Sequence, residues 1–583
     1  MKSKLIAGIL VTLFLVTTVF SGIQVKAEPK TLRVGVVGPV GMMQWNGLWE
    51  GAQMARDEVN SWNGGQGIVV GTDNYQIQLV QIDSHAYPVI DPAGGVIALT
   101  NALTTGDGLD FLIGGFRTEC VNPMVETFVA YCDANNDSAS YPQPVWYIAG
   151  AATDSLMAQV NKSLPTGNPD YPTSYDKYRY MFRVTPMTSS FLVSAFITFA
   201  AGWVISHQLI PMYGANGLPP VNAYIVAENL AWCDAMPGAL LGALAHPTSP
   251  VNIYPGYTAP SPICKYMGLA RPAWDETDFS SILTDIENKD VRIVFHVFSA
   301  LGGAPFIKQF GEREIDAVAV GINVESQAAE FYSTIGGKCE YESFLASVGS
   351  RTPIWEALGW GTATQDFWDA YLTRFGHAPI YTAWGAYDGI IGFSEFMEDQ
   401  AGWPMLYDDY IPLLEVTARQ GLLGYFKFTQ SDFETLGLGL GPVTARHDVY
   451  CEDLLNTWLG FHYVRTQLPQ WQNGVLEVVW PRDQMYSRKY KIPPWMYEMS
   501  EADWYGAKDI SDYPNPTIGP DGVVDIADLG GFLAWQASPT TLGILEADMD
   551  GNNFINILDI SKVAVHYDYN ASEPANYGQW PLP

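Results

Sequence analysis

The sequence has few basic residues and few cysteines. Its 583 residues include 30 Lys and Arg against 62 Asp and Glu, a formal net charge of −32. Because so acidic a surface repels nucleic acid and anionic lipid, nucleic acid is not expected as a partner. The six cysteines form no Cys-x-x-Cys pair, so thiolate metal sites are not predicted. One or two disulfides could form after export, and the sequence does not fix their pairing.

Long apolar runs are also scarce. After residue 27, no run reaches the roughly 18 apolar residues that a membrane helix requires. At the N-terminus, Lys2 and Lys4 precede an apolar run over residues 5–20, and a small-residue cleavage site ends at Ala27. This pattern is typical of a secretory signal peptide over residues 1–27 and predicts a secreted or cell-surface protein. An N-terminal anchor that is not removed is the alternative.

Short apolar runs alternate with segments of helical periodicity. Leu48, Ala52 and Val59, for example, fall on one face of a helix. Because strands joined by helices form parallel sheets, the pattern predicts an α/β fold with two doubly wound parallel sheets. Predicted strands cover residues 31–38, 75–83, 110–115 and 145–150 in a first series, and 222–228, 251–257, 291–298 and 317–323 in a second.

Two motifs follow predicted strands of the first series. "GGFRTEC" places Arg117, Thr118 and Glu119 between one strand and a helix, and "IAGAATDSL" places Ala151, Ala152 and Thr153 after the next strand. The N-terminus of a helix offers free N–H groups to a carboxylate or phosphate. For each motif alone, ordinary helix capping is the alternative, because Thr and Asp are good N-caps.

These motifs do not stand alone. Together with "RVGVVGPVG", "DEVNSWNGGQG", "YMFRVTP", "DFSSILTDI", "VRIVFHVFSA" and "WGAYDGI", they resemble the periplasmic binding proteins of the branched-chain amino-acid type over residues 31–480. Those proteins are the soluble receptors of ABC importers. The resemblance implies two lobes, joined by a three-strand hinge, that close over a small ligand and deliver it to a membrane permease. The lobes would cover residues 31–183 with 350–423 and 184–349 with 424–482, followed by a linker over 483–508.

The resemblance also assigns roles to residues. It implies that Thr118, Ala151 and Thr153 bind a ligand carboxylate. By the same matching, Trp45 covers the ligand, and the second lobe contributes Trp232 and Ser299.

One position departs from the family. Asn323 stands where the family has a carboxylate that pairs with the ligand's ammonium group. A neutral amide does not offset the desolvation of an ammonium as a carboxylate does. Either Glu325, Asp154 or Asp388 replaces it, or the ligand is not a simple amino acid. For Asp388, a solvated or capping carboxylate is the alternative.

The C-terminal segment over residues 509–570 has a different composition, rich in acids. In "DMDGNNFINILD" (residues 548–559), oxygen ligands fall at the spacing of a calcium-binding loop. The predicted Ca²⁺ ligands are Asp548, Asp550, Asn552, the backbone carbonyl of Phe554, Asn556 and Asp559. An acidic surface turn is the alternative.

This segment resembles the dockerin modules of cell-surface assemblies, which pair two calcium loops with helices. The first loop departs from the pattern, with Thr517 and Gly519 where acids belong. The resemblance implies a small all-α module that attaches the protein to a cohesin-like surface partner.

No G-x-S-x-G, H-E-x-x-H or phosphate-binding loop is present, so no enzyme activity is expected and the lobes are predicted to need no cofactor. The sequence therefore predicts an extracellular solute-binding receptor for an amino acid or a related amide or carboxylate. A dockerin-bearing polysaccharide hydrolase, with some of the 19 Trp and 32 Tyr lining a sugar groove, is one alternative. A ligand sensor with the same fold is the other.

Overall fold

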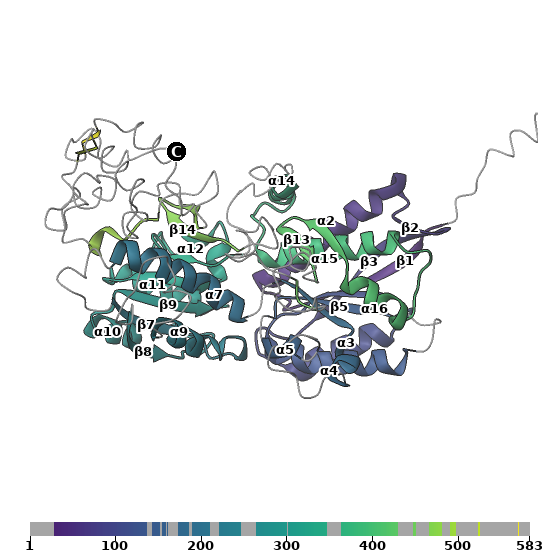
Figure 1. Ribbon diagram of the computed structural model, residues 1–583, viewed down its shortest axis with the longest axis horizontal. Coiled ribbons are helices and arrows are strands. Elements are labelled where there is room, and N and C mark those ends of the chain that lie inside the picture. The colour runs from purple at the N-terminus through teal and green to yellow at the C-terminus, as the bar shows by residue number, and fades with distance from the viewer. Residues whose placement is uncertain are drawn as a thin grey trace, which may run out of the picture.

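The protein folds into two lobes, each built around one sheet (Figure 1). The structure is a computed structural model. It describes residues 28–136, 143–151, 154–158, 160, 173–185, 189–209, 221–245, 264–299, 301–346, 363–428, 447–449, 466–480, 490–496, 523–524 and 569–570.

The first lobe contains a six-stranded sheet in the order β2-β3-β1-β4-β5-β6. Strand β1 is buried from residue 34 onward and pairs in parallel with β3 and β4, as expected for a strand with both faces covered. Only the edge pair of β2 and β3 is antiparallel. The strands are β1 (Lys30–Gly38), β2 (Ile68–Val70), β3 (Asp73–Asp83), β4 (Phe111–Gly114), β5 (Val145–Ala149) and β6 (Met181–Thr185).

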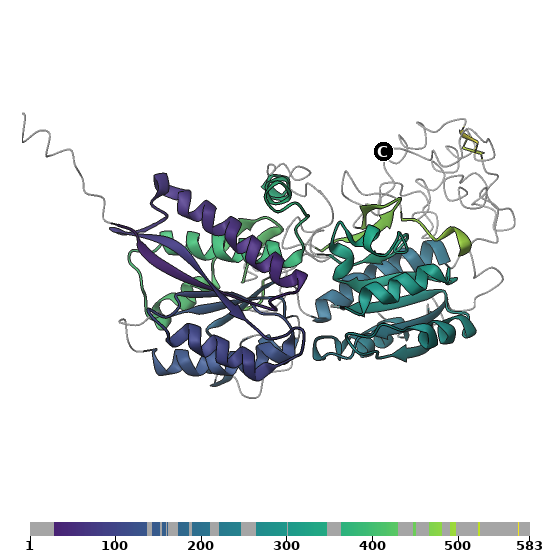
Figure 2. The same ribbon diagram turned by 180° about the vertical axis from the view of Figure 1, so that it is seen from behind.

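Helices cover both faces of this sheet. Helices α2 and α15 lie on one side and α3 and α4 on the other (Figure 2). Helices α2 and α15 can cross closely because Gly51 has no side chain. A Cβ at this position would collide with the carbonyl of Ala383. The elements are α2 (Met43–Gly65), α3 (Pro92–Thr104), α4 (Thr118–Ala134), α5 (Asp154–Ala158), α6 (Thr173–Tyr178), α14 (Ala363–Phe375), α15 (Tyr381–Glu398) and α16 (Tyr407–Glu415), with the hairpin β12 (Ala418–Gly421) and β13 (Gly424–Lys427).

The second lobe contains a seven-stranded sheet in the order β15-β14-β11-β10-β9-β7-β8. Its central strands are parallel, and β14 and β15 form an antiparallel edge. The strands are β7 (Val221–Ala227), β8 (Cys264–Ala270), β9 (Ile293–Phe298), β10 (Val318–Asn323), β11 (Ser343–Phe344), β14 (Leu468–Gln472) and β15 (Val475–Trp480). The helices are α7 (Ser189–Phe199), η1 (Ala200–Leu209), η2 (Ala231–Cys233), α9 (Met236–Ala245), α10 (Ser280–Asn288), α11 (Gly303–Glu312), η4 (Glu325–Gln327), α12 (Phe331–Thr334) and η5 (Pro494–Met496).

The two sheets confirm the α/β prediction, with two differences. The sheets are mixed, because an antiparallel pair of strands forms one edge of each. The sequence predicted a strand over 251–257, which lies outside the described residues, and it predicted no strand at β2, β6, β8 or β11.

The lobe boundaries also differ in detail from the predicted ones. Phe426 and Phe428 pack in the first core, beyond the expected end of that lobe at 423. Asp448 returns to β6, where it pairs with Arg183 (Nε to Oδ1, 2.6 Å). Tyr490 lies in the predicted linker but packs in the second core, together with Ile492 and Met496. Three stretches of chain therefore cross between the lobes, after residues 185, 346 and 449.

Several predictions concern parts that are only partly described. The predicted signal peptide and all six calcium ligands lie outside the described residues. Of the predicted tail module, the structure describes only β16 (Val523–Val524) and β17 (Tyr569–Asn570), which pair antiparallel. Among the described helices, none is long and apolar enough to cross a membrane. The four cysteines whose side chains are described, Cys120, Cys132, Cys233 and Cys339, are free and buried.

Candidate ligand-binding site

A cavity lies between the two lobes. It encloses about 570 Å³ of empty space, part of it open to solvent. The first lobe contributes Phe116, Arg117, Gly150 and Tyr381 to its wall. The second lobe contributes the apolar Leu192, Ile322, Val324, Leu345 and Ala346, and the polar Trp232, Ser299, Gln327 and Thr466.

The wall forms at the carboxyl ends of parallel strands, where open α/β sheets bind ligands. Arg117 lies between β4 and α4, Gly150 follows β5, and Ser299 follows β9. Two of these positions have unusual backbones, with φ of 64° at Arg117 and 130° at Gly150. A Cβ at Gly150 would collide with the carbonyl of Gly115, so only glycine fits there. A positive φ at a non-glycine residue costs energy and is often found at functional sites.

Arg117 is a buried cation with part of its hydrogen-bonding capacity unused. Its side chain is 2% exposed, and its Nη1 donates to the carbonyl of Ala86 at 3.0 Å. The guanidinium lies 4.0 Å from the centre of the Trp274 ring, a cation–π contact with the second lobe. Nε and Nη2 have no partner among the described residues. Burial lowers the pKa of Arg117, while Glu228 and Glu119 act in the opposite direction.

Glu228 fixes two side chains of the wall. It follows β7 and is fully buried. Its Oε1 accepts hydrogen bonds from Trp232 Nε1 (2.7 Å), from the backbone N–H of Ser299 (2.9 Å) and from the Ser299 hydroxyl. Burial raises the pKa of Glu228 to about 6, and these hydrogen bonds and the Arg117 charge oppose that rise. Glu228 therefore orients the second-lobe side of the cavity.

Direct hydrogen bonds join the lobes around the cavity. Gln44 Nε2 donates to the carbonyl of Ser299 at 2.8 Å. The N–H of Ala231 donates to Glu119 Oε1 at 2.7 Å, and the N–H of Tyr381 donates to Gln327 Oε1 at 3.2 Å. The cavity is thus enclosed by contacts that would have to break if the lobes separated.

Of the predicted site residues, Trp232 and Ser299 form part of the described cavity wall, and Thr118 and Ala151 are each next in sequence to a wall residue. Thr118 begins α4 directly after Arg117, is 2% exposed, and has no partner for its Oγ1 among the described residues. Ala151 is buried next to Gly150, and its carbonyl accepts from Arg183 Nη1 at 3.2 Å. Thr153 lies outside the described residues.

Other predicted site residues do not lie in the described wall. Trp45 is buried in the first core, where it stacks on Trp49 at 5.3 Å between ring centres. Asn323 is fully buried and donates through Nδ2 to Glu342 Oε1 at 2.9 Å. Glu325 accepts from the backbone N–H of Ala304 at 2.9 Å.

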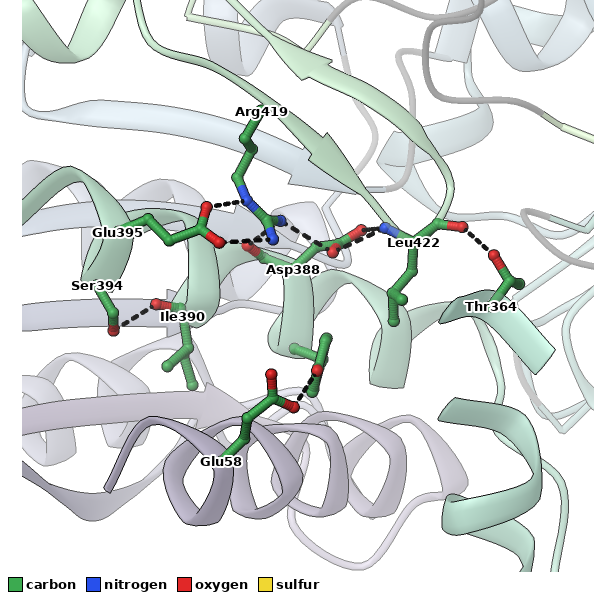
Figure 3. A network of polar contacts seen from close by, with 9 residues as sticks. Glu58, Thr364, Asp388, Ile390, Ser394, Glu395, Arg419 and Leu422 are labelled. Atoms are coloured by element: carbon green, nitrogen blue, oxygen red, sulfur yellow. Dashed lines mark hydrogen bonds and ion pairs between the residues drawn. The ribbon is translucent and has the colours of Figure 1, made fainter. Parts of the chain in front are cut away.

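Asp388 lies on α15 inside the first lobe (Figure 3). Its carboxylate accepts from Arg419 Nη1 at 3.1 Å and from the N–H of Leu422 at 3.0 and 2.9 Å. Burial raises its pKa, and Arg419 opposes that rise. Its oxygens are therefore engaged in holding the β12–β13 turn onto α15, away from the described cavity wall.

Sequence reasoning missed Phe116, Gln327 and Tyr381. It places Arg117 at the turn in "GGFRTEC" but assigns the ligand contact to the neighbouring Thr118. The motif does not reveal that the Arg117 side chain is buried or that two of its donors lack a partner, because both depend on the tertiary structure. Among the described residues, no group of three or more His, Cys, Asp or Glu side chains could hold a metal ion.

Comparison with solved structures identifies the fold. A protein from Silicibacter pomeroyi, assigned as a branched-chain amino acid ABC transporter, has 16% sequence identity and a TM-score of 0.56, over 80% of this chain and 100% of its own. The branched-chain amino acid transporter substrate-binding protein LivJ from Streptococcus pneumoniae, solved with isoleucine, has 15% identity and a TM-score of 0.53, over 77% and 99%. A solute-binding protein of an ABC transporter from R. palustris, solved with benzoate, has 13% identity and a TM-score of 0.50, over 77% and 95%.

No protein-family model matches the chain, and no curated protein matches it in sequence. At such low identity the structural likeness shows the fold alone. The chain has the two-lobed α/β fold of ABC-transporter solute-binding proteins.

Proposed function

We propose that the protein is a secreted solute-binding receptor that holds a small ligand between its lobes and delivers it to the permease of an ABC importer. The observation that carries the proposal is the cavity between the lobes, which joins a buried Arg117 to a largely apolar wall. Similar folds have been solved with isoleucine and with benzoate. An amino acid, or a related amide or carboxylate, is therefore the ligand class to test first.

A thermal-shift screen tests this function. The panel should include amino acids, their amides, small carboxylates and sugars. Because a ligand that binds only the folded state stabilises it by mass action, a hit at about 100 times its Kd should add about 2.7 kcal/mol to the unfolding free energy. Isothermal titration should then give a single site per chain. A folded protein that no member of the panel stabilises would contradict the receptor function.

We further propose that the C-terminal segment binds one Ca²⁺ and attaches the receptor to a cohesin-like partner at the cell surface. The support is the ligand spacing of residues 548–559 and the acidic composition around it. Without the ion, the carboxylates of Asp548, Asp550 and Asp559 would repel one another within a short stretch of chain.

Titration of calcium into the full chain tests the tail. One site should be detected in the wild type and lost in Asp548→Ala and Asp559→Ala, because each removes an oxygen ligand. Ligand binding in the cleft should be the same in all three proteins. Absence of calcium binding at millimolar concentration would end the dockerin-like interpretation and leave the receptor function untouched.

A further inference from the structure

Two donors of Arg117 are buried in the cavity wall without a partner. Nε and Nη2 have no acceptor among the described residues, while Nη1 is occupied by the Ala86 carbonyl. A buried donor left unsatisfied costs about 1–3 kcal/mol, more on a charged group. Arg also keeps its charge throughout the physiological pH range. Arg117, a residue of the wall, therefore has two unused donors for an anionic acceptor, although the charges of Glu228 and Glu119 already act on its guanidinium.

The geometry of these donors matches a carboxylate. Nε and Nη2 lie on the same edge of the planar guanidinium, and this edge can donate to both oxygens of one carboxylate. Arg117 also directly precedes the 17-residue helix α4, whose N-terminus carries partial positive charge. Both features favour a negative group at the same place.

The rest of the described wall suits an apolar body. Phe116 from the first lobe faces the same cavity as Leu192, Ile322 and Leu345 from the second. These side chains are almost completely buried, so a ligand that binds between them is removed from contact with water. The wall thus favours a hydrocarbon or aromatic skeleton beside the acid group.

An ammonium group finds no matching partner. None of the described wall residues is acidic. Oε1 of Glu228 already accepts three hydrogen bonds and Oε1 of Glu119 accepts one. The second oxygen of each is buried without a partner among the described residues, and neither residue belongs to the described wall. Desolvating an ammonium without a carboxylate partner costs several kcal/mol. Among the described wall residues, a zwitterion therefore finds a partner for its carboxylate and none for its ammonium group.

Resting on the proposed receptor function, we propose that the ligand is an apolar monocarboxylic acid without an amino group, bound through Arg117. This narrows the ligand class from amino acids in general to acids that lack the ammonium group. It also assigns Arg117 as the residue that determines specificity.

Matched probes test this class by isothermal titration on the full chain. One series is isocaproate, isocaproamide, L-leucine and isopentylamine, which share a skeleton and differ in charge. Hydrocinnamate, L-phenylalanine and phenethylamine form a second series with an aromatic body. We expect the acid of at least one series to bind roughly tenfold or more tightly than every other member of that series, because only the acid pairs with Arg117 without burying a second charge.

The outcomes separate the two proposals. Tighter binding of L-leucine, L-phenylalanine or either amine would overturn the ligand class and leave the receptor function standing. If neither acid binds while another compound of the broad screen does, the ligand class is likewise wrong. If no compound of either set binds a folded protein, both proposals fail.

Variants test the role of Arg117 itself. Arg117→Lys keeps the charge but loses the two-donor edge, and should weaken binding of the acid roughly 10- to 100-fold. Arg313→Lys, at an exposed arginine that bonds Thr284 and Glu287, is the matched control and should bind as the wild type does. Unchanged affinity in a folded Arg117→Lys protein would remove the assignment. If this variant does not fold, the probe series on the wild type still decides the class.

Discussion

Gln44 and Ser299, which are 255 positions apart in the chain, are joined by a buried hydrogen bond of 2.8 Å between the two lobes. Gln44 belongs to α2 of the first lobe, and Ser299 follows β9 of the second. Ser299 is also a wall residue, so the bond couples the cavity directly to the contact between the lobes. Closure and ligand binding should therefore depend on each other.

Removing this bond should favour an open form. Gln44→Ala should weaken ligand binding roughly fivefold, because a typical hydrogen bond contributes about 1 kcal/mol. Small-angle scattering should show that ligand reduces the radius of gyration of the wild type, and that Gln44→Ala needs more ligand to reach the same value. Gln78→Ala, at an exposed position on β3, is the control. Scattering curves that do not change at saturating ligand would contradict hinge closure.

Thr118 and Thr364 are both almost fully buried but differ in partners. Thr118 Oγ1 has none among the described residues, whereas Thr364 Oγ1 donates to the carbonyl of Leu422 at 2.7 Å. Thr118→Val should leave the unfolding free energy within about 0.5 kcal/mol and weaken ligand binding by about 1–3 kcal/mol. Thr364→Val should leave ligand binding unchanged and lower the unfolding free energy by about 1 kcal/mol. Calorimetry that finds the affinity of Thr118→Val unaltered would show that this hydroxyl does not contact the ligand.

Asp388 should matter for stability and not for binding. Asp388→Ala takes one of two carboxylate partners from the partly buried Arg419 and removes the acceptor of the Leu422 N–H, and should cost about 3 kcal/mol of unfolding free energy. Glu395→Ala removes the other partner of Arg419, a half-exposed carboxylate, and should cost less than about 1 kcal/mol. Urea denaturation measures both. If Asp388→Ala loses ligand affinity and keeps its stability, Asp388 contacts the ligand and the structural role is wrong.

Glu228 should give stability a distinctive dependence on pH. Its pKa of about 6 in the folded protein lies above the ordinary 4.5. Between these values the folded protein holds a proton that the unfolded chain has released, so this group's contribution decreases as pH rises from 4.5 to about 6. The loss amounts to about 2 kcal/mol.

Glu228→Gln removes that titration. The unfolding free energy of the variant relative to the wild type should therefore rise by about 2 kcal/mol across this window and stay constant above it. Urea denaturation at several pH values measures the difference. Glu312→Gln, at a half-exposed carboxylate on α11, is the control and should follow the wild type. Parallel curves for Glu228→Gln and the wild type would show that Glu228 does not titrate in this range.

The sequence by itself determined the class of fold. Apolar runs between segments of helical periodicity placed β1, β4, β5, β7, β9 and β10, because a strand covered on both faces must be apolar almost throughout. Alternation of polar and apolar residues placed β3, which is only partly buried. The same local logic placed Thr118 after a strand, whereas Trp232 and Ser299 came from the family resemblance. It could not place β8, whose "CKYMGLA" is too mixed in polarity to stand out.

Only the tertiary structure decided which of the candidate groups are available to a ligand. Asp388 and Asn323 look like ligand contacts in the sequence, yet Arg419 and Glu342 occupy them. Arg117 looks like an ordinary loop residue, yet it is buried with two unused donors. The periodicity of apolar residues along the chain indicates on which face of a helix or strand a residue lies. The partners that satisfy a polar group come from segments hundreds of residues away, and they become known only when the chain has folded.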